Sequence, residues 1–187
     1  IVLTLVSVGT AVLFRWLNGG VKRFYARYGV EHGELLSTVA LGFAASGAVL
    51  IATAALYAAT VSDTSPAAVL GVVALTLLWG AVELDLALTN AQLRPFAFGR
   101  LSLAKAALGL ICGASAALLG YGAAGVVAGM IGGHLLSLIL FSSREWRSVK
   151  YRLASQDCLR RLLRYGLPLT AAFALSVFIA LSDRLLI

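Results

Sequence analysis

Charged residues are scarce in this chain, and so are cysteine, histidine and proline. Asp, Glu, Lys and Arg make up 12% of the 187 residues, whereas a soluble domain carries about 25%. Apolar residues make up 60%, which excludes both an ordinary soluble domain and an intrinsically disordered chain. Two cysteines cannot form a zinc site, and we predict neither a metal nor a cofactor.

The chain has instead six long apolar segments, each near the 20 residues that a membrane-spanning helix needs. They cover residues 1–17, 36–61, 66–89, 101–119, 123–142 and 167–187. The first could continue through the Asn-Gly-Gly run at 18–20 towards Phe24. No segment alternates apolar and polar residues, which disfavours a transmembrane barrel of strands. We therefore predict an all-α fold, a polytopic bundle of transmembrane helices.

The connections between these segments alternate in charge. Residues 18–34, 90–100 and 143–165 contain Lys and Arg, seven of them in the last link, whereas 61–65 and 120–122 contain none. Basic loops stay on the cytoplasmic side of a membrane. We therefore predict a multi-pass protein of the cytoplasmic membrane whose net charge of +7 sets its orientation. Membrane lipids are expected partners, and nucleic acid is not.

The basic link at 143–165 has the pattern of an amphipathic helix over 156–165. Gly166 should end this helix and Pro168 should begin the next, since proline suits the first helical turn. The apolar side would lie in the membrane interface, and a tether is favoured over a specific lipid receptor. The chain begins without Met and ends within an apolar run, so we expect a longer protein.

Polar residues inside an apolar segment are candidates for function because burying them in lipid is costly. Steps of three and four residues in the third segment place six small or polar side chains on one helical stripe. These are Thr76, Gly80, Glu83, Ala87, Asn90 and Arg94. Glu83 could serve a cavity or a structural ion pair, and both remain open. Asp85 points away from this stripe, which favours a structural role.

Other intramembrane polar residues carry alternatives too. Arg15 reaches the cytoplasmic surface if its helix ends at Leu17, but faces a cavity if the helix continues. His134 stands beside glycines at every fourth position, which favours an interhelical hydrogen bond over a proton relay. Asp183 and Arg184 point about 100° apart, so only one of them can face a given partner.

Motifs of catalysis are missing. The chain has no P-loop, no HExxH and no GxSxG, and no cluster of acidic residues faces the membrane surface. With two histidines and no loop of any size on the outer side, a glycosyltransferase or polymerase site has no obvious place. We therefore predict that the chain is not an enzyme.

Three stretches resemble a known family. The sequence RRLLRYGLPL at 160–169, followed by SDRLLI at 182–187, is similar to the start of the seventh helix in polysaccharide biosynthesis flippases. The sequence LNGGVKRFYA at 17–26 resembles the end of that family's second helix, although it has more glycine than is usual there. The sequence NAQLR at 90–94 resembles the link after the fourth helix.

This resemblance implies a protein of the multidrug/oligosaccharidyl-lipid/polysaccharide exporter superfamily, which has two helical lobes around a cavity. Residues 1–142 would form five helices of the first lobe, 143–165 the cytoplasmic link, and 166–187 the first helix of the second lobe. A break at the glycines of 18–20 would change the depth of Arg15.

The resemblance also implies the transport of undecaprenyl-pyrophosphate-linked oligosaccharide to the outer leaflet by alternating access. Contacts with the substrate would come from Arg15, Arg23, Asn90 and Arg184. A coupling proton or sodium ion would bind at Glu83, Asp183 or His134. Two alternatives remain: a cation-coupled multidrug efflux antiporter, whose cavity would favour acidic residues, and a scaffold subunit that transports nothing.

Overall fold

The computed structural model describes residues 2–28, 32–61 and 65–185, and describes no side chain beyond Leu175. Within these ranges the chain forms six α-helices and no strand. The helices are α1 (Val2–Tyr28), α2 (His32–Thr60), α3 (Pro66–Ala91), α4 (Pro95–Leu118), α5 (Gly122–Phe141) and α6 (Gln156–Leu185). Two short 3₁₀ helices, η2 (Arg144–Ser148) and η3 (Tyr151–Leu153), lie between α5 and α6. The prediction of an all-α polytopic bundle is confirmed.

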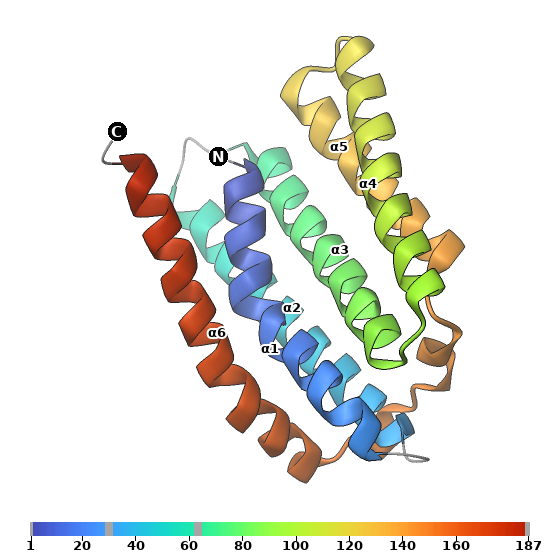
Figure 1. Cartoon of the computed structure of the whole chain (residues 1–187). Helices are drawn as coiled ribbons and strands as arrows, with labels where there is room; N and C mark the ends of the chain where they lie inside the picture. The colour runs from blue at the N-terminus through green and yellow to red at the C-terminus, as the bar shows by residue number, and fades with distance from the viewer. Residues whose placement is uncertain (1, 29–31, 62–64, 186–187) are drawn as a thin grey trace.

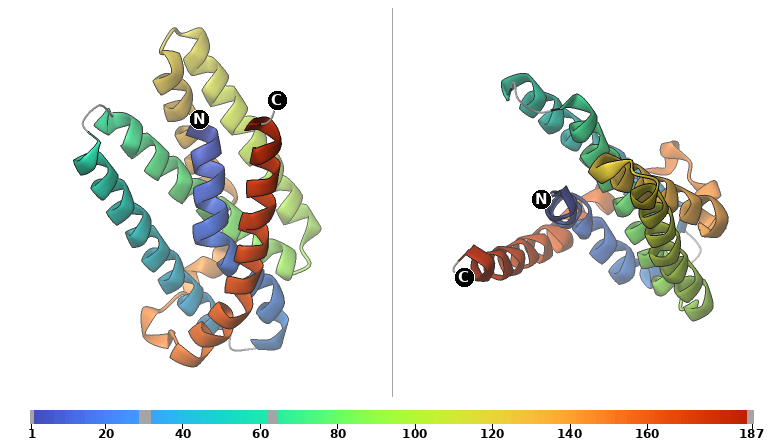
Figure 2. Two further views of the ribbon diagram at one scale, coloured as in Figure 1. Left: turned by 90° about the vertical axis from the view of Figure 1, so that its left-hand side faces the viewer. Right: turned by 90° about the horizontal axis from the view of Figure 1, so that it is seen from above.

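The six helices run alternately up and down, so their connections gather at two opposite ends (Figure 1). The three basic links lie at one end, here called the basic end, and both termini lie at the other (Figure 1). Helix α1 contacts α2, α3 and α6, while α4 and α5 form a hairpin against α3. Seen from above, α6 and the α4–α5 hairpin lie on opposite sides of α1 (Figure 2).

Five helices are long and apolar enough to cross a membrane. They are α1 to α5, and the protein is therefore a multi-pass membrane protein. Helix α6 is not among these five in the described part of the chain, so the sixth span and the division into lobes stay predictions.

Helix α1 continues without a break through the glycines at 18–20. These glycines serve helix packing, because a Cβ on Gly19 would lie 2.7 Å from Leu169 Cδ2 of α6. The longer of the two alternatives for the first segment therefore holds. Arg15 lies thirteen residues from either end of α1, at its centre.

The prediction that Gly166 ends one helix and Pro168 begins another is wrong. Helix α6 is continuous, with Pro168 inside it. Gly166 lets α6 approach α1, since a Cβ there would lie 2.8 Å from the carbonyl oxygen of Trp16. The Thr170 hydroxyl donates to the Gly166 carbonyl oxygen of the same helix (3.0 Å).

The sequence predicted that the apolar side of residues 156–165 lies in the membrane interface. This prediction is wrong for the first turns of α6. Cys158 and Leu162 are buried in the protein core with Leu17, Leu36 and Leu88 from α1, α2 and α3. The protein core, and not the membrane lipid, therefore shields these apolar side chains from water.

The link before α6 is fastened to the bundle by hydrogen bonds. Asp85, 1% exposed, accepts hydrogen bonds from the backbone N–H of Ser143 (3.1 Å) and from Trp146 Nε1 (3.0 Å). Ser37 of α2 accepts a further bond from the Lys150 N–H (3.1 Å). Asp85 therefore has the structural role that its position opposite the polar stripe predicted.

Candidate functional site

A cavity of about 490 Å³ lies between α1, α3, α4 and α6. Its polar lining is mostly cationic or amide in character, and the remainder is apolar or aromatic. The lining residues are Arg15, Asn18, Gly19, Lys22, Arg23, Glu83, Leu86, Ala87, Asn90, Phe98, Tyr165 and Leu169. The volume falls in the range of small-molecule sites.

A second hollow of about 160 Å³ continues this cavity towards the other end of the bundle. The two share Arg15, Asn18 and Glu83 in their linings, so they are adjacent. Together they extend from beyond the centre of α1 down to Asn90, near the end of α3. We call the two hollows together the central cavity.

Arg15 lies where the two hollows meet, in the middle of a helix long enough to span a membrane. Its guanidinium carbon lies 3.4 Å from the ring centroid of Phe173 on α6. A guanidinium over an aromatic face is held electrostatically. The arginine therefore faces the cavity, which was one of the two alternatives for it.

Two more cations from α1 lie nearer the basic end. Lys22 and Arg23 both line the cavity, and the guanidinium carbon of Arg23 lies 5.5 Å from the ring centroid of Tyr165. The sequence prediction named Arg23 but not Lys22, which it counted among the residues that set the topology. Continuation of the α1 helix beyond residue 17 is what brings Lys22 to the cavity wall.

The predicted polar stripe of α3 divides into three parts. Glu83, Ala87 and Asn90 line the central cavity. Further up, Gly80 packs beneath Phe14 of α1, where a Cβ would lie 2.6 Å from the ring. At the other end Arg94 leaves the stripe and lies 3.8 Å from Glu145 of η2. Only the middle of the stripe faces the cavity.

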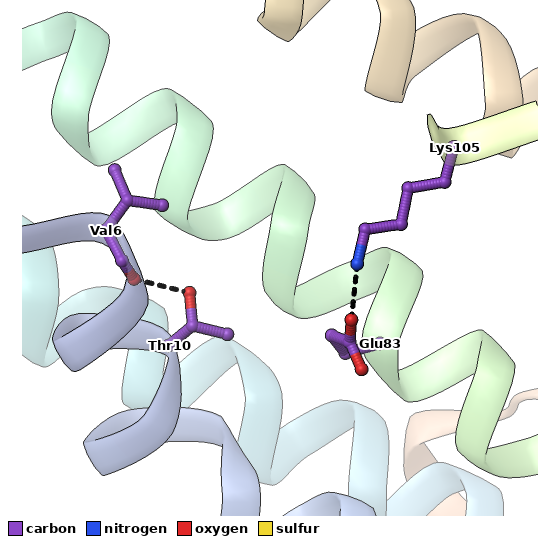
Figure 3. A network of polar contacts seen from close by, with 4 residues as sticks. All are labelled: Val6, Thr10, Glu83 and Lys105. Atoms are coloured by element: carbon purple, nitrogen blue, oxygen red, sulfur yellow. Dashed lines mark hydrogen bonds and ion pairs between the residues drawn. The ribbon is translucent and has the colours of Figure 1, made fainter. Parts of the chain in front are cut away.

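Glu83 combines the two alternatives that the sequence left open. It lines the cavity, and it also forms an ion pair and hydrogen bond with Lys105, which reaches across from α4 (Figure 3). The Lys105 ammonium also lies 4.6 Å from the Trp79 ring centroid. In α1, by contrast, the Thr10 hydroxyl donates a hydrogen bond to the Val6 carbonyl oxygen of the same helix (Figure 3).

Sequence reasoning missed Lys105 and Asn18. Lys105 was grouped with the preceding basic link, although it lies inside the fourth apolar segment, and that position was the available signal. Asn18 lines the cavity, and its buried Oδ1 has no hydrogen-bond partner among the described residues. Unsatisfied buried polar atoms are rare and point to a ligand or water.

His134 does not line the central cavity. It is 3% exposed within the α4–α5 hairpin, and its ring stacks on Trp79 at 5.4 Å between centroids. The glycines beside it make the close approach that the sequence predicted, because a Cβ on Gly133 would lie 2.6 Å from the Leu108 carbonyl. The favoured interhelical hydrogen bond is not found among the described residues: Nδ1 lies 2.8 Å from the Met130 carbonyl oxygen of the same helix, and the buried Nε2 has no described partner.

The remaining predicted site residues, Asp183 and Arg184, lie outside the side chains that the structure describes. Among those that it does describe, no cluster of His, Cys, Asp or Glu is arranged to hold a metal ion.

The charges of the central cavity fit an anion. Arg15, Lys22 and Arg23 face it, and its carboxylate, Glu83, is paired with Lys105. Arginine guanidinium groups suit phosphate because their N–H donors match its oxygens in pairs. The amides of Asn18 and Asn90 can serve hydroxyl groups, since each amide both donates and accepts.

Comparison with known proteins agrees with this geometry. The sequence profile of a family described as "polysaccharide biosynthesis protein" matches residues 4–187, nearly the whole chain. No curated protein and no solved structure matches the chain. The match covers the central cavity, all six helices and the three stretches that carried the resemblance. On this evidence the chain belongs to the polysaccharide biosynthesis protein family and has its role in polysaccharide biosynthesis.

Proposed function

We propose that the protein is a flippase, which moves a lipid-linked oligosaccharide with a pyrophosphate group across the cytoplasmic membrane. The observation that carries this proposal is a cationic cavity inside helices that can span a membrane, with Arg15 at mid-helix. Membership of a polysaccharide biosynthesis family supports a sugar-bearing substrate. The family resemblance further favours undecaprenyl pyrophosphate as the lipid carrier.

The physical problem of such transport is the headgroup. A sugar pyrophosphate is charged and strongly hydrated, and moving it unaided through about 30 Å of hydrocarbon is prohibitively costly. In our proposal Arg15, Lys22 and Arg23 replace water around the phosphates, and Asn18 and Asn90 bind sugar hydroxyl groups. The prenyl tail stays in the lipid.

Transport would follow alternating access, in which the cavity opens first to one side and then to the other. The larger hollow of the central cavity lies between the middle of α1 and the basic end, which positive-inside logic assigns to the cytoplasm. We therefore interpret this structure as a form that receives substrate from the cytoplasmic leaflet. Such a cycle involves no covalent chemistry, so we propose a transporter and not an enzyme.

A coupling proton or sodium ion would act at Glu83, the carboxylate on the cavity wall. Loss of its negative charge would free Lys105 and make the cavity more cationic. Asp183 remains a second candidate. His134 is a weaker one, because it lies in the α4–α5 hairpin away from the cavity.

The charges argue against the efflux antiporter as the alternative. A cavity for cationic drugs would expose carboxylates, whereas here three cations face the cavity and Glu83 is already paired. A scaffold subunit would have no need of a charged cavity within its spans, because such groups are costly there.

The test replaces Arg15 by alanine in cells that depend on the protein for surface polysaccharide. We expect Arg15→Ala to abolish surface glycan while the amount of protein in the membrane stays normal. Arg100→Ala is the matched control, because Arg100 is exposed on α4 and does not line the cavity. Unchanged surface glycan in Arg15→Ala would exclude Arg15 from substrate handling.

A further inference from the structure

The two arginines of the central cavity each face an aromatic ring of the same helix, one guanidinium carbon at 3.4 Å and the other at 5.5 Å from the ring centroid. Arg15 lies over the ring of Phe173, and Arg23 lies over the ring of Tyr165. Both rings belong to α6. The two arginines are eight residues apart on α1, and the two rings are eight residues apart on α6, which runs antiparallel. Eight helical residues span about 12 Å, so the contacts form two matched levels along one seam.

The seam between α1 and α6 is close enough to hold these contacts in register. Gly19 lies against Leu169, which stands between the two rings on α6. Gly166 lies against the backbone of Trp16. Because both helices present glycine at the contact, their axes approach and the aromatic side chains reach the arginines. Continuity of α6 through Pro168 keeps both rings on one helix.

An aromatic partner leaves an arginine free to bind an anion. Stacking uses the face of the guanidinium, whereas its N–H donors lie in the plane and point outward. A carboxylate partner would instead occupy those donors and compete with phosphate. Among the described residues no carboxylate lies within 4.0 Å of Arg15 or Arg23, whereas Lys105 is paired with Glu83. Each arginine thus contacts a ring and is not neutralised by a described carboxylate.

We propose that Phe173 and Tyr165 are positioning residues, which hold Arg15 and Arg23 with their N–H donors directed at the phosphates of the substrate. This inference rests on the proposed function and adds α6 to the binding site. The arginines form two anion-binding levels, with Arg23 nearer the basic end and Arg15 at mid-membrane. A headgroup would meet Arg23 first and Arg15 after moving deeper.

The experiment measures binding of farnesyl diphosphate, a short prenyl pyrophosphate, to the full chain in lipid nanodiscs, with farnesol as the uncharged probe. Phe173→Leu keeps an apolar side chain but removes the ring. We expect it to weaken diphosphate binding by about fivefold, as the strength of a cation–π contact implies. Farnesol binding should not change. Phe173→Tyr, which restores a ring, should bind nearly as the wild type does.

Two further variants separate positioning from packing. Tyr165→Leu should also weaken diphosphate binding, because it removes the ring that Arg23 contacts. It provides the test if Phe173→Leu does not fold. Phe24→Leu is the control, because Phe24 packs edge-on against Tyr165 in the same seam but lies under no guanidinium. It should keep wild-type affinity, and thermal unfolding of each variant should show an intact bundle.

Arg15→Gln and Arg23→Gln distinguish this inference from the proposed function. If they weaken diphosphate binding but neither ring variant does, Phe173 and Tyr165 have no positioning role and the flippase proposal stands. Equal losses in Phe173→Leu, Phe173→Tyr and Phe24→Leu would mean that the seam acts only through packing, which overturns the inference. If neither arginine variant affects binding, the proposed function fails and the inference fails with it.

Discussion

At the scale of single residues, charge inside an apolar segment was the signal that found Arg15 and Glu83, whereas the family resemblance supplied Arg23 and, together with the polar stripe, Asn90. Arg15, Arg23, Glu83 and Asn90, which the sequence singled out, all line one cavity. The partner of Lys105 could not be assigned from the sequence, since its contact with Glu83 depends on how α3 and α4 lie side by side. Which polar residues face each other across helices is a property of packing that no local pattern contains.

The pair of Glu83 and Lys105 leads to a prediction about stability. Lys105→Met leaves the Glu83 carboxylate, whose side chain is 36% exposed, without its partner on the cavity wall. We expect a loss of about 1 kcal/mol or more in the free energy of unfolding, because breaking one side of a partly buried pair leaves an uncompensated charge. Thermal or denaturant unfolding in detergent would measure it.

The double variant Glu83→Gln with Lys105→Met is the control for this pair. It removes both charges, so it should recover most of the stability that Lys105→Met loses. If the double variant loses as much stability as Glu83→Gln and Lys105→Met lose together when made singly, the two side chains do not interact.

At the scale of elements, local signals gave the helices but misplaced some of their ends. Gly166 and Pro168 usually interrupt a helix, and here tertiary contact overrides that tendency because α6 packs closely on α1. The glycine stripe of α5 was interpreted correctly, since spacing of four is a signal for close packing itself. The sequence could not show that the apolar face of the first turns of α6 packs against protein. A face that contacts lipid and a face that contacts a protein core have the same apolar side chains.

Two adjacent glycines of α5 allow a matched test of this packing. A Cβ on Gly133 would lie 2.6 Å from the Leu108 backbone, whereas a Cβ on Gly132 would meet nothing within 4 Å. We expect Gly133→Ala to destabilise the protein by about 2 kcal/mol through overpacking. Gly132→Ala should be neutral or slightly stabilising, because alanine favours the helix. Unfolding midpoints of the two variants provide the comparison, and equal midpoints would contradict the close approach.

At the scale of the whole molecule, the alternation of basic and uncharged links predicts two ends, and the structure places the three basic links together (Figure 1). The order of the segments and the charge of each link are enough to predict this placement, because both are known from the sequence. The position of α6 against α1 was not predictable in this way, since it depends on glycine contacts between helices far apart in sequence.

The orientation in the membrane can be tested with single cysteines at the two ends. In a variant whose Cys112 and Cys158 are replaced, Arg160→Cys should be protected from a membrane-impermeant maleimide in intact cells, and Tyr121→Cys should react. Both native side chains are exposed, so their accessibility depends on the side of the membrane. Opening the cells should make Arg160→Cys reactive. The reverse pattern in intact cells would place the basic end outside.

The central claim is that the cationic cavity carries a pyrophosphate-linked sugar across a bilayer, and movement of such a lipid in vesicles tests it most directly. The full chain is reconstituted with a fluorescent prenyl-pyrophosphate sugar, and the fraction accessible to a quencher outside the vesicles is followed with time. We predict that the wild type and Arg100→Ala move the lipid between leaflets, whereas Arg15→Gln does so at least tenfold more slowly, as loss of about 1.4 kcal/mol or more implies. Equal rates for Arg15→Gln and the wild type, or no movement above empty vesicles with either, would contradict the claim.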